Sequence, residues 1–149
     1  MRAVIQRCNY GSVTSEGEVT GSVKKGLVVL LAVGKEDENA DLEYIVSKIL
    51  NLRIFEDAAG KLNFSVQDIK GDILVISQFT LYGDCRKGRR PSFTDAAPPE
   101  KANRMYETAV LKLRESGLCI ETGRFQTHMK VLLENDGPVT ILLDSGRGF

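Results

Sequence analysis

The stretch of the sequence that decides the fold reads Ile73-Leu74-Val75-Ile76-Ser77-Gln78-Phe79-Thr80. Its first four residues are apolar and mostly β-branched, and the turn-forming pair Gly71-Asp72 precedes them. A short apolar run bounded in this way is typical of a buried strand. The polar residues that follow would lie where the strand leaves the core. This point of the chain is therefore the first candidate for a functional site.

A second apolar run, Leu27 to Val33, indicates a central sheet. It lacks polar alternation, which is typical of a strand covered on both faces. Residues 2–8 also read as a strand, and residues 12–14 either extend it or start the next one. Further strands are predicted at residues 18–24, 51–55, 119–121, 129–133 and 139–143. Gly17 marks a hairpin turn before residues 18–24.

Two amphipathic helices are predicted beside this sheet. The first begins at the acidic stretch 36–39, where the helix dipole favours negative charge. Its apolar residues follow helical spacing at Leu42, Ile45, Val46 and Ile49. The second begins at Pro98-Pro99-Glu100 and ends at Gly117. Its buried stripe would consist of Ala102, Met105, Tyr106, Ala109, Val110 and Leu113.

These patterns predict one mixed α/β domain of the α+β kind over residues 1–149, with the two main amphipathic helices packed on a sheet. Helices on one face leave the other face for a second β layer. Residues 83–99 form a loop that is long for a compact domain, and such loops often carry function. Residues 145–149 are predicted to be a frayed tail.

Composition limits the classes of protein to which the chain could belong. The chain has 149 residues, 42% of them hydrophobic, with 20 basic and 20 acidic side chains. A neutral total argues against a histone-like nucleic-acid coat, although it permits a local basic patch. The three cysteines Cys8, Cys85 and Cys119 are far apart, which predicts reduced thiols. Without a signal-peptide pattern or a membrane-length apolar run, the expected location is the cytoplasm.

The second stretch of interest is Asn135-Asp136-Gly137-Pro138-Val139-Thr140, which separates the strand-like runs 130–133 and 139–143. Asn-Gly and Asp-Gly are common in hairpin turns. Here Pro138 follows, and proline cannot donate a ladder hydrogen bond. The stretch therefore indicates more than a simple connector.

The usual hydrolase arrangements do not fit these residues. A Ser-His-Asp triad would need His128, the single histidine, and no Gly-x-Ser-x-Gly elbow surrounds any serine. One histidine and scattered cysteines also make a poor metal-ligand set. Ser77 and Thr80 remain as a nucleophile or an orienting donor, yet they could equally satisfy backbone groups at a strand end.

Five motifs make the sequence resemble the D-aminoacyl-tRNA deacylases of the bacterial and eukaryotic type. They cover nearly the whole chain in one register: residues 1–7, 48–55, Ser77-Gln78-Phe79-Thr80, residues 86–93 and Asn135 to Thr140. The resemblance implies a three-layer β/β/α fold and a homodimer with pockets at its interface. It also implies hydrolysis of the ester bond of aminoacyl-tRNA without a metal or an organic cofactor, and with no membrane or DNA partner.

The same resemblance implies roles for particular residues. The catalytic stretch would be Ser77, Gln78, Phe79 and Thr80. Gly137-Pro138, joined by a cis bond, would reach into the partner subunit's pocket and select substrate handedness. The tRNA or the pocket rim would be contacted by Arg7, Arg86, Lys87, Arg89 and Arg90.

Several alternatives stay open at this point. Phe79 could stack on the terminal adenine or belong to the core, and the basic run could be an ordinary solvated surface. A non-catalytic RNA-binding module and a small-molecule esterase are competing functions. The sequence also departs from the family pattern at Gln126-Thr127-His128, where members commonly have Gly-Ala before the methionine strand. If this segment lines the pocket, the room for substrate changes.

Overall fold

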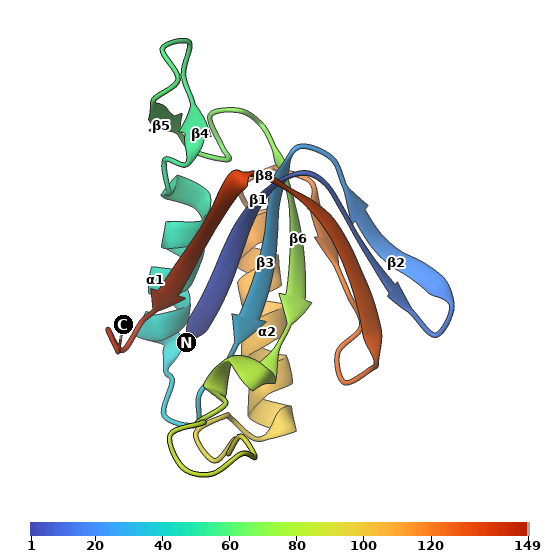
Figure 1. Ribbon diagram of the computed structural model, residues 1–149, viewed down its shortest axis with the longest axis vertical. Helices are drawn as coiled ribbons and strands as arrows, with labels where there is room; N and C mark the ends of the chain where they lie inside the picture. The colour runs from blue at the N-terminus through green and yellow to red at the C-terminus, as the bar shows by residue number, and fades with distance from the viewer. Residues whose placement is uncertain (149) are drawn as a thin grey trace.

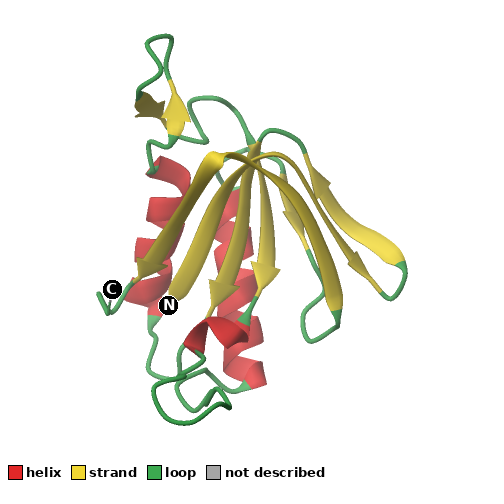
Figure 2. Ribbon diagram, viewed as in Figure 1, coloured by secondary structure: helices red, strands yellow, loops and turns green. Residues whose placement is uncertain are grey.

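One six-stranded sheet carries both stretches, and two helices cover one of its faces (Figures 1 and 2). The structure is a computed structural model that describes residues 1–148. Its elements are, in chain order, β1 (Arg2–Ser15), β2 (Glu18–Val23), β3 (Gly26–Ala32), α1 (Asn39–Asn51), β4 (Phe55–Glu56), β5 (Leu62–Phe64), β6 (Asp72–Ser77), the 3-10 helix η1 (Phe79–Tyr82), α2 (Pro99–Arg114), β7 (Ile120–Thr122) and β8 (Met129–Asp144).

The strand order is β2-β1-β3-β6-β7, and β8 pairs with β1. β6 is parallel to β3 and to β7, whereas β1 is antiparallel to its three partners. Because Leu31 lies opposite Ser77 in the parallel pair, β3 and β6 end at the same edge of the sheet. That edge holds the first candidate stretch.

The predicted mixed α/β class and its three layers are confirmed, and both β layers come from a single sheet that nearly closes on itself. The β1–β2 hairpin folds over β6 and β7, where a Cβ added to Gly21 would lie 2.8 Å from the carbonyl oxygen of Thr122. The side chains buried between these layers are Cys8, Val13, Val23, Val28, Leu74 and Ile76.

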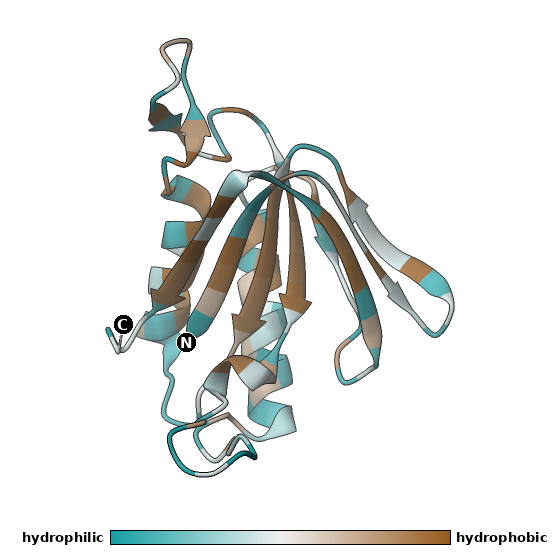
Figure 3. Ribbon diagram, viewed as in Figure 1, coloured by the Kyte–Doolittle hydropathy of each residue, from teal (hydrophilic) through white to brown (hydrophobic). Residues whose placement is uncertain are grey.

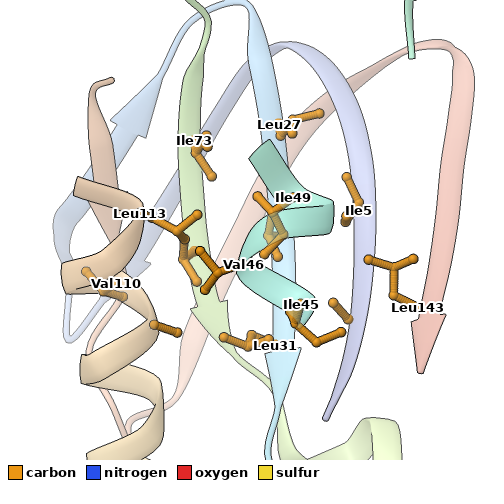
Figure 4. Packing of buried hydrophobic residues seen from close by; sticks show 14 of the residues in the cluster. Ile5, Leu27, Leu31, Ile45, Val46, Ile49, Ile73, Val110, Leu113 and Leu143 are labelled. Atoms are coloured by element: carbon orange, nitrogen blue, oxygen red, sulfur yellow. The ribbon is translucent and has the colours of Figure 1, made fainter. Parts of the chain in front are cut away.

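The helix layer packs on the opposite face, as the apolar spacing predicts. Figure 4 shows the buried side chains of α1 and α2 directed at those of the sheet. The predicted stripe is buried in α1 at Leu42, Ile45, Val46 and Ile49, and in α2 at Met105, Tyr106, Ala109, Val110 and Leu113, whereas the predicted Ala102 is only partly buried. Figure 3 shows that apolar residues are concentrated along the central strands of the sheet. Each large side chain removed from water in this way contributes about 1.5–3 kcal/mol.

The prediction of two separate strands around Gly137-Pro138 is wrong. Residues 129–135 and 140–144 all pair with the same strand, β1, so the segment is a bend within β8 rather than a hairpin turn. The pairing register shifts opposite this bend, between Gln6 and Cys8 and again between Cys8 and Tyr10. The physical reason is that Pro138 cannot donate to the ladder, so pairing stops there and resumes beyond it.

Smaller differences concern the ends of elements. The first strand continues through residues 12–14, and the strand predicted at 51–55 is reduced to Phe55–Glu56. The predicted tail is anchored at its first residue, because the N–H of Ser145 donates to the carbonyl oxygen of Met1 at 2.9 Å, whereas residues 146–148 are exposed. Phe149, which the same prediction includes, lies outside the described residues. Within residues 1–148, neither helix is long and apolar enough to cross a membrane.

Candidate active site

A cavity of about 1090 Å³ opens at the edge where β3 and β6 end. Its walls come from the ends of β3 and β6, the loop before α2, the first turns of α2, the turn before β8 and the start of β8. The lining residues are Ala32, Val33, Ile76 to Phe79, Phe93, Thr94, Ala96 to Pro99, Ala102, Phe125 to Thr127, Met129 and Val131. The lining residues all belong to the described part of the chain, and none of them carries a charge. The volume is at the upper end of the range for small-molecule sites. It therefore exceeds what a single amino acid needs.

The catalytic stretch predicted from the sequence lies at the mouth of this cavity. The backbone N–H of Gln78 donates to the carbonyl oxygen of Leu31 at 2.8 Å, which extends the β3–β6 pairing by one residue. The chain then turns into η1, and the side-chain amide of Gln78 donates to the hydroxyl of Thr80. Ser77, Gln78 and Phe79 line the cavity, whereas Thr80 is exposed beside it.

The turn also leaves backbone donors available. Within residues 1–148, no backbone acceptor is paired with the N–H of Phe79 or of Thr80, the first two residues of η1. Such donors are free to form hydrogen bonds with water or with a ligand. Two neighbouring N–H groups can hold the oxygen of a polarised carbonyl, as oxyanion holes do.

Phe79 is not part of the core, which settles one alternative left open by the sequence. Its side chain is 54% exposed, and its ring lies edge-on to that of Phe93 at 5.1 Å. Phe93 also lines the cavity. The long loop thus folds back onto the catalytic stretch, a contact that no sequence pattern signalled.

The basic run lies on the same loop. The backbones of Asp84 and Ser92 pair with each other at its base, with N–O distances of 2.8 and 2.9 Å. Arg86 donates twice to the carboxylate of Asp84, at 2.8 Å each, and this pairing holds the pKa of Asp84 well below its usual range. Lys87, Arg89 and Arg90 are exposed, and the structure described for residues 1–148 gives them no ion pair.

The predicted selection dipeptide lies elsewhere. The Gly137-Pro138 peptide bond is cis, as the resemblance implies, and Gly137 has φ +136°. Neither residue lines the cavity of its own chain. The carboxamide of Asn135 spans the bend: its Oδ1 accepts from the N–H of Val139 at 2.7 Å, and its Nδ2 donates to the hydroxyl of Thr140 at 3.0 Å.

Arg7 is buried beneath this bend and does not line the cavity. Its Nε donates to the carbonyl oxygen of Asp136 at 2.8 Å, and its Nη1 donates to that of Ile54 at 2.9 Å. Nη2 lies 3.5 Å from the carboxylate of Glu56. The structure therefore brings Arg7 together with Gly137-Pro138, and not with the Ser77 to Thr80 stretch.

The segment that departs from the family pattern does line the cavity. Gln126 has φ +58°, in the left-handed region that favours glycine. Gln126 and Thr127 both belong to the wall, whereas His128 is exposed and does not. In the described residues, no group of three or more His, Cys, Asp or Glu could hold a metal ion.

Comparison with known proteins gives consistent matches. The model of the family described as D-Tyr-tRNA(Tyr) deacylase matches residues 4–144. Proteins named D-aminoacyl-tRNA deacylase from Thermosipho melanesiensis and Clostridioides difficile are 61% and 56% identical, and each match covers the whole of both chains.

Two solved structures are also similar. One, described as "c-Myc DNA Unwinding Element Binding Protein", has a TM-score of 0.91 and 44% identity, and the match covers 97% of this chain and 98% of that one. Another, described as "Structural Analysis of a probable eukaryotic D-amino acid tRNA deacylase", has a TM-score of 0.82 over 95% and 97% of the two chains. Its 17% identity supports a shared fold alone.

Proposed function

We infer, since this chain belongs to the D-aminoacyl-tRNA deacylase family, that it hydrolyses the ester bond of D-aminoacyl-tRNA and releases the D-amino acid and the tRNA. The observation that carries the proposal is the uncharged cavity at the end of β6, with Ser77, Gln78 and Phe79 at its mouth. An ester needs less activation than an amide. Positioning and oxyanion stabilisation therefore suffice as the main contributions of the protein.

In the proposed mechanism the ester carbonyl oxygen accepts hydrogen bonds from the N–H groups of Phe79 and Thr80. The vicinal 2′-hydroxyl of the terminal ribose helps to activate water or the ester. Thr80 orients the substrate rather than attacking it, because its hydroxyl is bound by the amide of Gln78. A hydroxyl without an adjacent base is a weak nucleophile. Retention of most activity in Thr80→Ala would support this assignment.

Handedness is set, in this proposal, by the main chain of Gly137-Pro138 occupying the space that an L side chain would need. Sparing L-aminoacyl-tRNA by about 10⁴-fold requires roughly 5.5 kcal/mol. One methylene in an apolar pocket gives only about 1–3 kcal/mol. A backbone obstacle reaches the larger value for many different amino acids, which attractive contacts to each D side chain would not. Glycine has no side chain to clash, so glycyl-tRNA would also be hydrolysed.

Because Gly137-Pro138 does not line its own cavity, the obstacle must come from a second copy of the chain. The outer face of the sheet offers a place for that copy. Leu142, Val4, Leu30 and Ile76 lie opposite one another on four adjacent strands, and so form one apolar row that faces away from the helices. Leu142 is 58% exposed and Val4 and Leu30 are half-buried, whereas Ile76 is buried at the end where the row meets the cavity. We propose that a homodimer covers this row and places each dipeptide at the partner's cavity.

Mixed dimers would test the exchange of the dipeptide between subunits. A Gln78→Ala chain has an impaired cavity and an intact dipeptide, whereas a Gly137→Ala chain has the reverse. In the proposed arrangement, the mixture regains one site that is both active and selective. A purified mixed dimer that is active but unselective would show that each chain uses its own dipeptide.

Deacylation of D-Tyr-tRNA, L-Tyr-tRNA and Gly-tRNA by the purified protein tests the function as a whole. The expected order is rapid loss of the D and glycyl forms and slow loss of the L form. Equal rates for D- and L-Tyr-tRNA would contradict exclusion by the dipeptide. Equal activity on free D-amino acid esters would instead indicate a small-molecule esterase, and binding of tRNA without hydrolysis would indicate an RNA-binding module.

A further inference from the structure

The turn before β8 presents one polar side chain at the cavity without an evident structural role. Gln126 is exposed and lines the cavity. Within residues 1–148, no side chain or backbone group is hydrogen bonded to its carboxamide. Its φ of +58° is uncommon for a residue other than glycine. Strained residues of this kind cluster at ligand-binding sites.

Hydrogen bonds and ion pairs of the neighbouring residues hold the backbone around Gln126 in place. The hydroxyl of Thr127 donates to the carbonyl oxygen of Arg124 at 3.0 Å and accepts from the hydroxyl of Ser15 at 2.8 Å. Ser15, the last residue of β1, is only 1% exposed, so this hydrogen bond anchors the turn to a buried residue of the sheet. Arg124 is in turn paired with Glu16 and with Glu18, at 2.9 Å each. The Gln126 side chain therefore projects from a fixed turn.

A glutamine carboxamide carries a donor and an acceptor side by side. That pattern complements the N6 and N7 atoms of adenine, to which glutamine binds with two hydrogen bonds. The other cavity walls suit a base as well, because Phe79, Phe93 and Phe125 provide aromatic surface for stacking. The cavity thus combines an uncharged aromatic enclosure with one unpaired amide.

The substrate has a variable part, the D-amino acid, and a constant part, the terminal adenosine of tRNA. A fixed polar group gives a large advantage only to ligands that match it, and leaves other ligands with an unsatisfied partner. A deacylase that acts on many amino acids would lose most of them if such a group faced the amino-acid side chain. The constant part is therefore the better partner for Gln126.

We propose that the carboxamide of Gln126 binds the N6–N7 edge of the terminal adenine, which makes Gln126 a specificity-determining residue. This inference rests on the proposed deacylase function. The wall formed by Phe125 to Thr127 would then recognise the nucleoside, and the amino acid would lie at the mouth of the cavity.

The test compares substrates and variants in a double cycle. D-Tyr-tRNA is prepared with adenosine, with purine riboside (which lacks the N6 amine) or with 7-deazaadenosine (which lacks N7) at its 3′ end. Gln126→Gly removes the amide and suits the local backbone, so it should fold. Lys70→Gly is the matched control, because Lys70 has φ +52° and does not line the cavity.

For the wild type and the control, kcat/KM should fall by about 10-fold or more with each altered base, mostly through KM. Gln126→Gly should show that loss already with adenosine, and little further loss with the altered bases. Additive losses would overturn the inference, as would a wild type that is indifferent to the base. A loss in Gln126→Gly that varies with the amino acid instead of the base would also overturn it.

Binding separates this inference from the proposed function. The probe is 3′-deoxy-3′-(D-alanylamino)adenosine, whose amide is not hydrolysed, together with its 7-deaza counterpart. Calorimetry should show a weaker Kd for the counterpart with the wild type, and no such difference with Gln126→Gly. A protein that failed to hydrolyse D-Tyr-tRNA but gave this binding result would refute only the proposed function. Hydrolysis combined with equal Kd values for both probes would refute only the role of Gln126.

Discussion

The guanidinium of Arg7 is hydrogen bonded to the backbone of Asp136, the residue that precedes Gly137, with 2.8 Å between Nε and the carbonyl oxygen. The same side chain reaches the carbonyl oxygen of Ile54 at 2.9 Å. One buried cation thus ties the bend of β8 to the segment that leaves α1. The position of Gly137-Pro138 is therefore set by contacts inside its own chain.

Arg7→Lys should destabilise the fold and reduce discrimination between D and L substrates. A lysine cannot donate to both carbonyl groups with the fork geometry of arginine. Losing a hydrogen bond of a charged donor to a buried acceptor costs about 1.5–3 kcal/mol. Urea unfolding would give the first effect, and the ratio of kcat/KM for D- and L-Tyr-tRNA the second. Arg53→Lys is a matched control, because Arg53 makes exposed contacts to Asn63. An unchanged ratio in Arg7→Lys would show that the anchor does not govern selection.

Gly137→Ala should be poorly tolerated at the bend. At φ +136° an added Cβ would lie 2.8 Å from Cγ2 of Val139 and 3.1 Å from Nη2 of Arg7. Backbone strain in this region costs about 1–3 kcal/mol before any clash. We expect a lower Tm and faster hydrolysis of L-Tyr-tRNA relative to D-Tyr-tRNA. Gly17→Ala is the control for strain alone, since Gly17 has φ +82° and no atom within 4 Å of an added Cβ. Selectivity that survives in Gly137→Ala would argue against a main-chain obstacle.

The dependence of kcat/KM on pH should lack the bell shape of enzymes that use a side-chain acid and base. None of the residues that line the cavity titrates between about pH 5.5 and 8.5. We expect the rate to rise smoothly with pH, as for hydroxide-like attack on an ester. Single-turnover deacylation over this range measures it. The α-amino group of the substrate itself titrates at about pH 8, so the comparison is made with an N-acetylated D-aminoacyl-tRNA. A plateau or a maximum near neutral pH with that substrate would reveal a protein group that the proposed mechanism omits.

Replacing the unpaired cations of the loop should weaken tRNA binding and its salt dependence. Removing one side chain that neutralises a phosphate reduces the slope of log K against log salt by about 0.7–0.9. We expect this from Lys87→Ala, Arg89→Ala and Arg90→Ala, measured as log KM between roughly 50 and 200 mM salt. Arg86→Ala should change the slope least, because Asp84 already neutralises that side chain. Slopes equal to that of the wild type in all four variants would show that the loop is an ordinary solvated surface.

Alkaline unfolding should involve Tyr106, whose hydroxyl donates to the carbonyl oxygen of Val75 at 2.9 Å. Burial raises the pKa of Tyr106 from 10.0 to about 12. A group whose pKa is raised by folding stabilises the protein fully below its unfolded pKa, and that contribution is lost as pH rises from about 10 to 12. The loss amounts to about 3 kcal/mol at most.

Tyr106→Phe should therefore flatten the fall of the unfolding free energy between about pH 10 and 12. At neutral pH the same variant should cost about 1 kcal/mol for the missing hydrogen bond. Some alkaline sensitivity would remain, because burial also raises the pKa of Cys8 to about 11. Urea titrations at neutral pH and at two values within the alkaline range make the comparison. A slope identical to that of the wild type would assign the alkaline loss to other groups.

The sequence predicted those parts of the fold that depend on local pattern. The apolar run of β6 and the spacing of Leu42 to Ile49 each identify an element, because a strand buried on both faces leaves a short apolar run and a helix buried on one face leaves a periodic pattern. The bend of β8 left no such trace. Asn135 to Pro138 has the composition of a turn, and only the pairing of both flanking runs with β1 shows that it is a kink.

The same limit applies to the site. Ser77 to Thr80 was found because polar residues directly follow a strand. Phe93 and Phe125 join the cavity through tertiary contacts, which short-range patterns do not encode. Arg7 was predicted to contact the tRNA or the pocket rim, whereas its hydrogen-bond partners Ile54 and Asp136 are 47 and 129 residues away. Its position could therefore not be derived from its neighbours in the chain.

The uncharged lining of the cavity also bears on inhibition. Cys8, Cys85 and Cys119 all lie outside it, and no lysine, histidine or carboxylate from residues 1–148 contributes to its walls. Alkylating agents, acylphosphates and other reagents that react with strong nucleophiles would therefore have no side chain to modify in the cavity. If the substrate binds there as we propose, an effective antagonist of this protein would have to compete reversibly, by shape and stacking, for the same cavity.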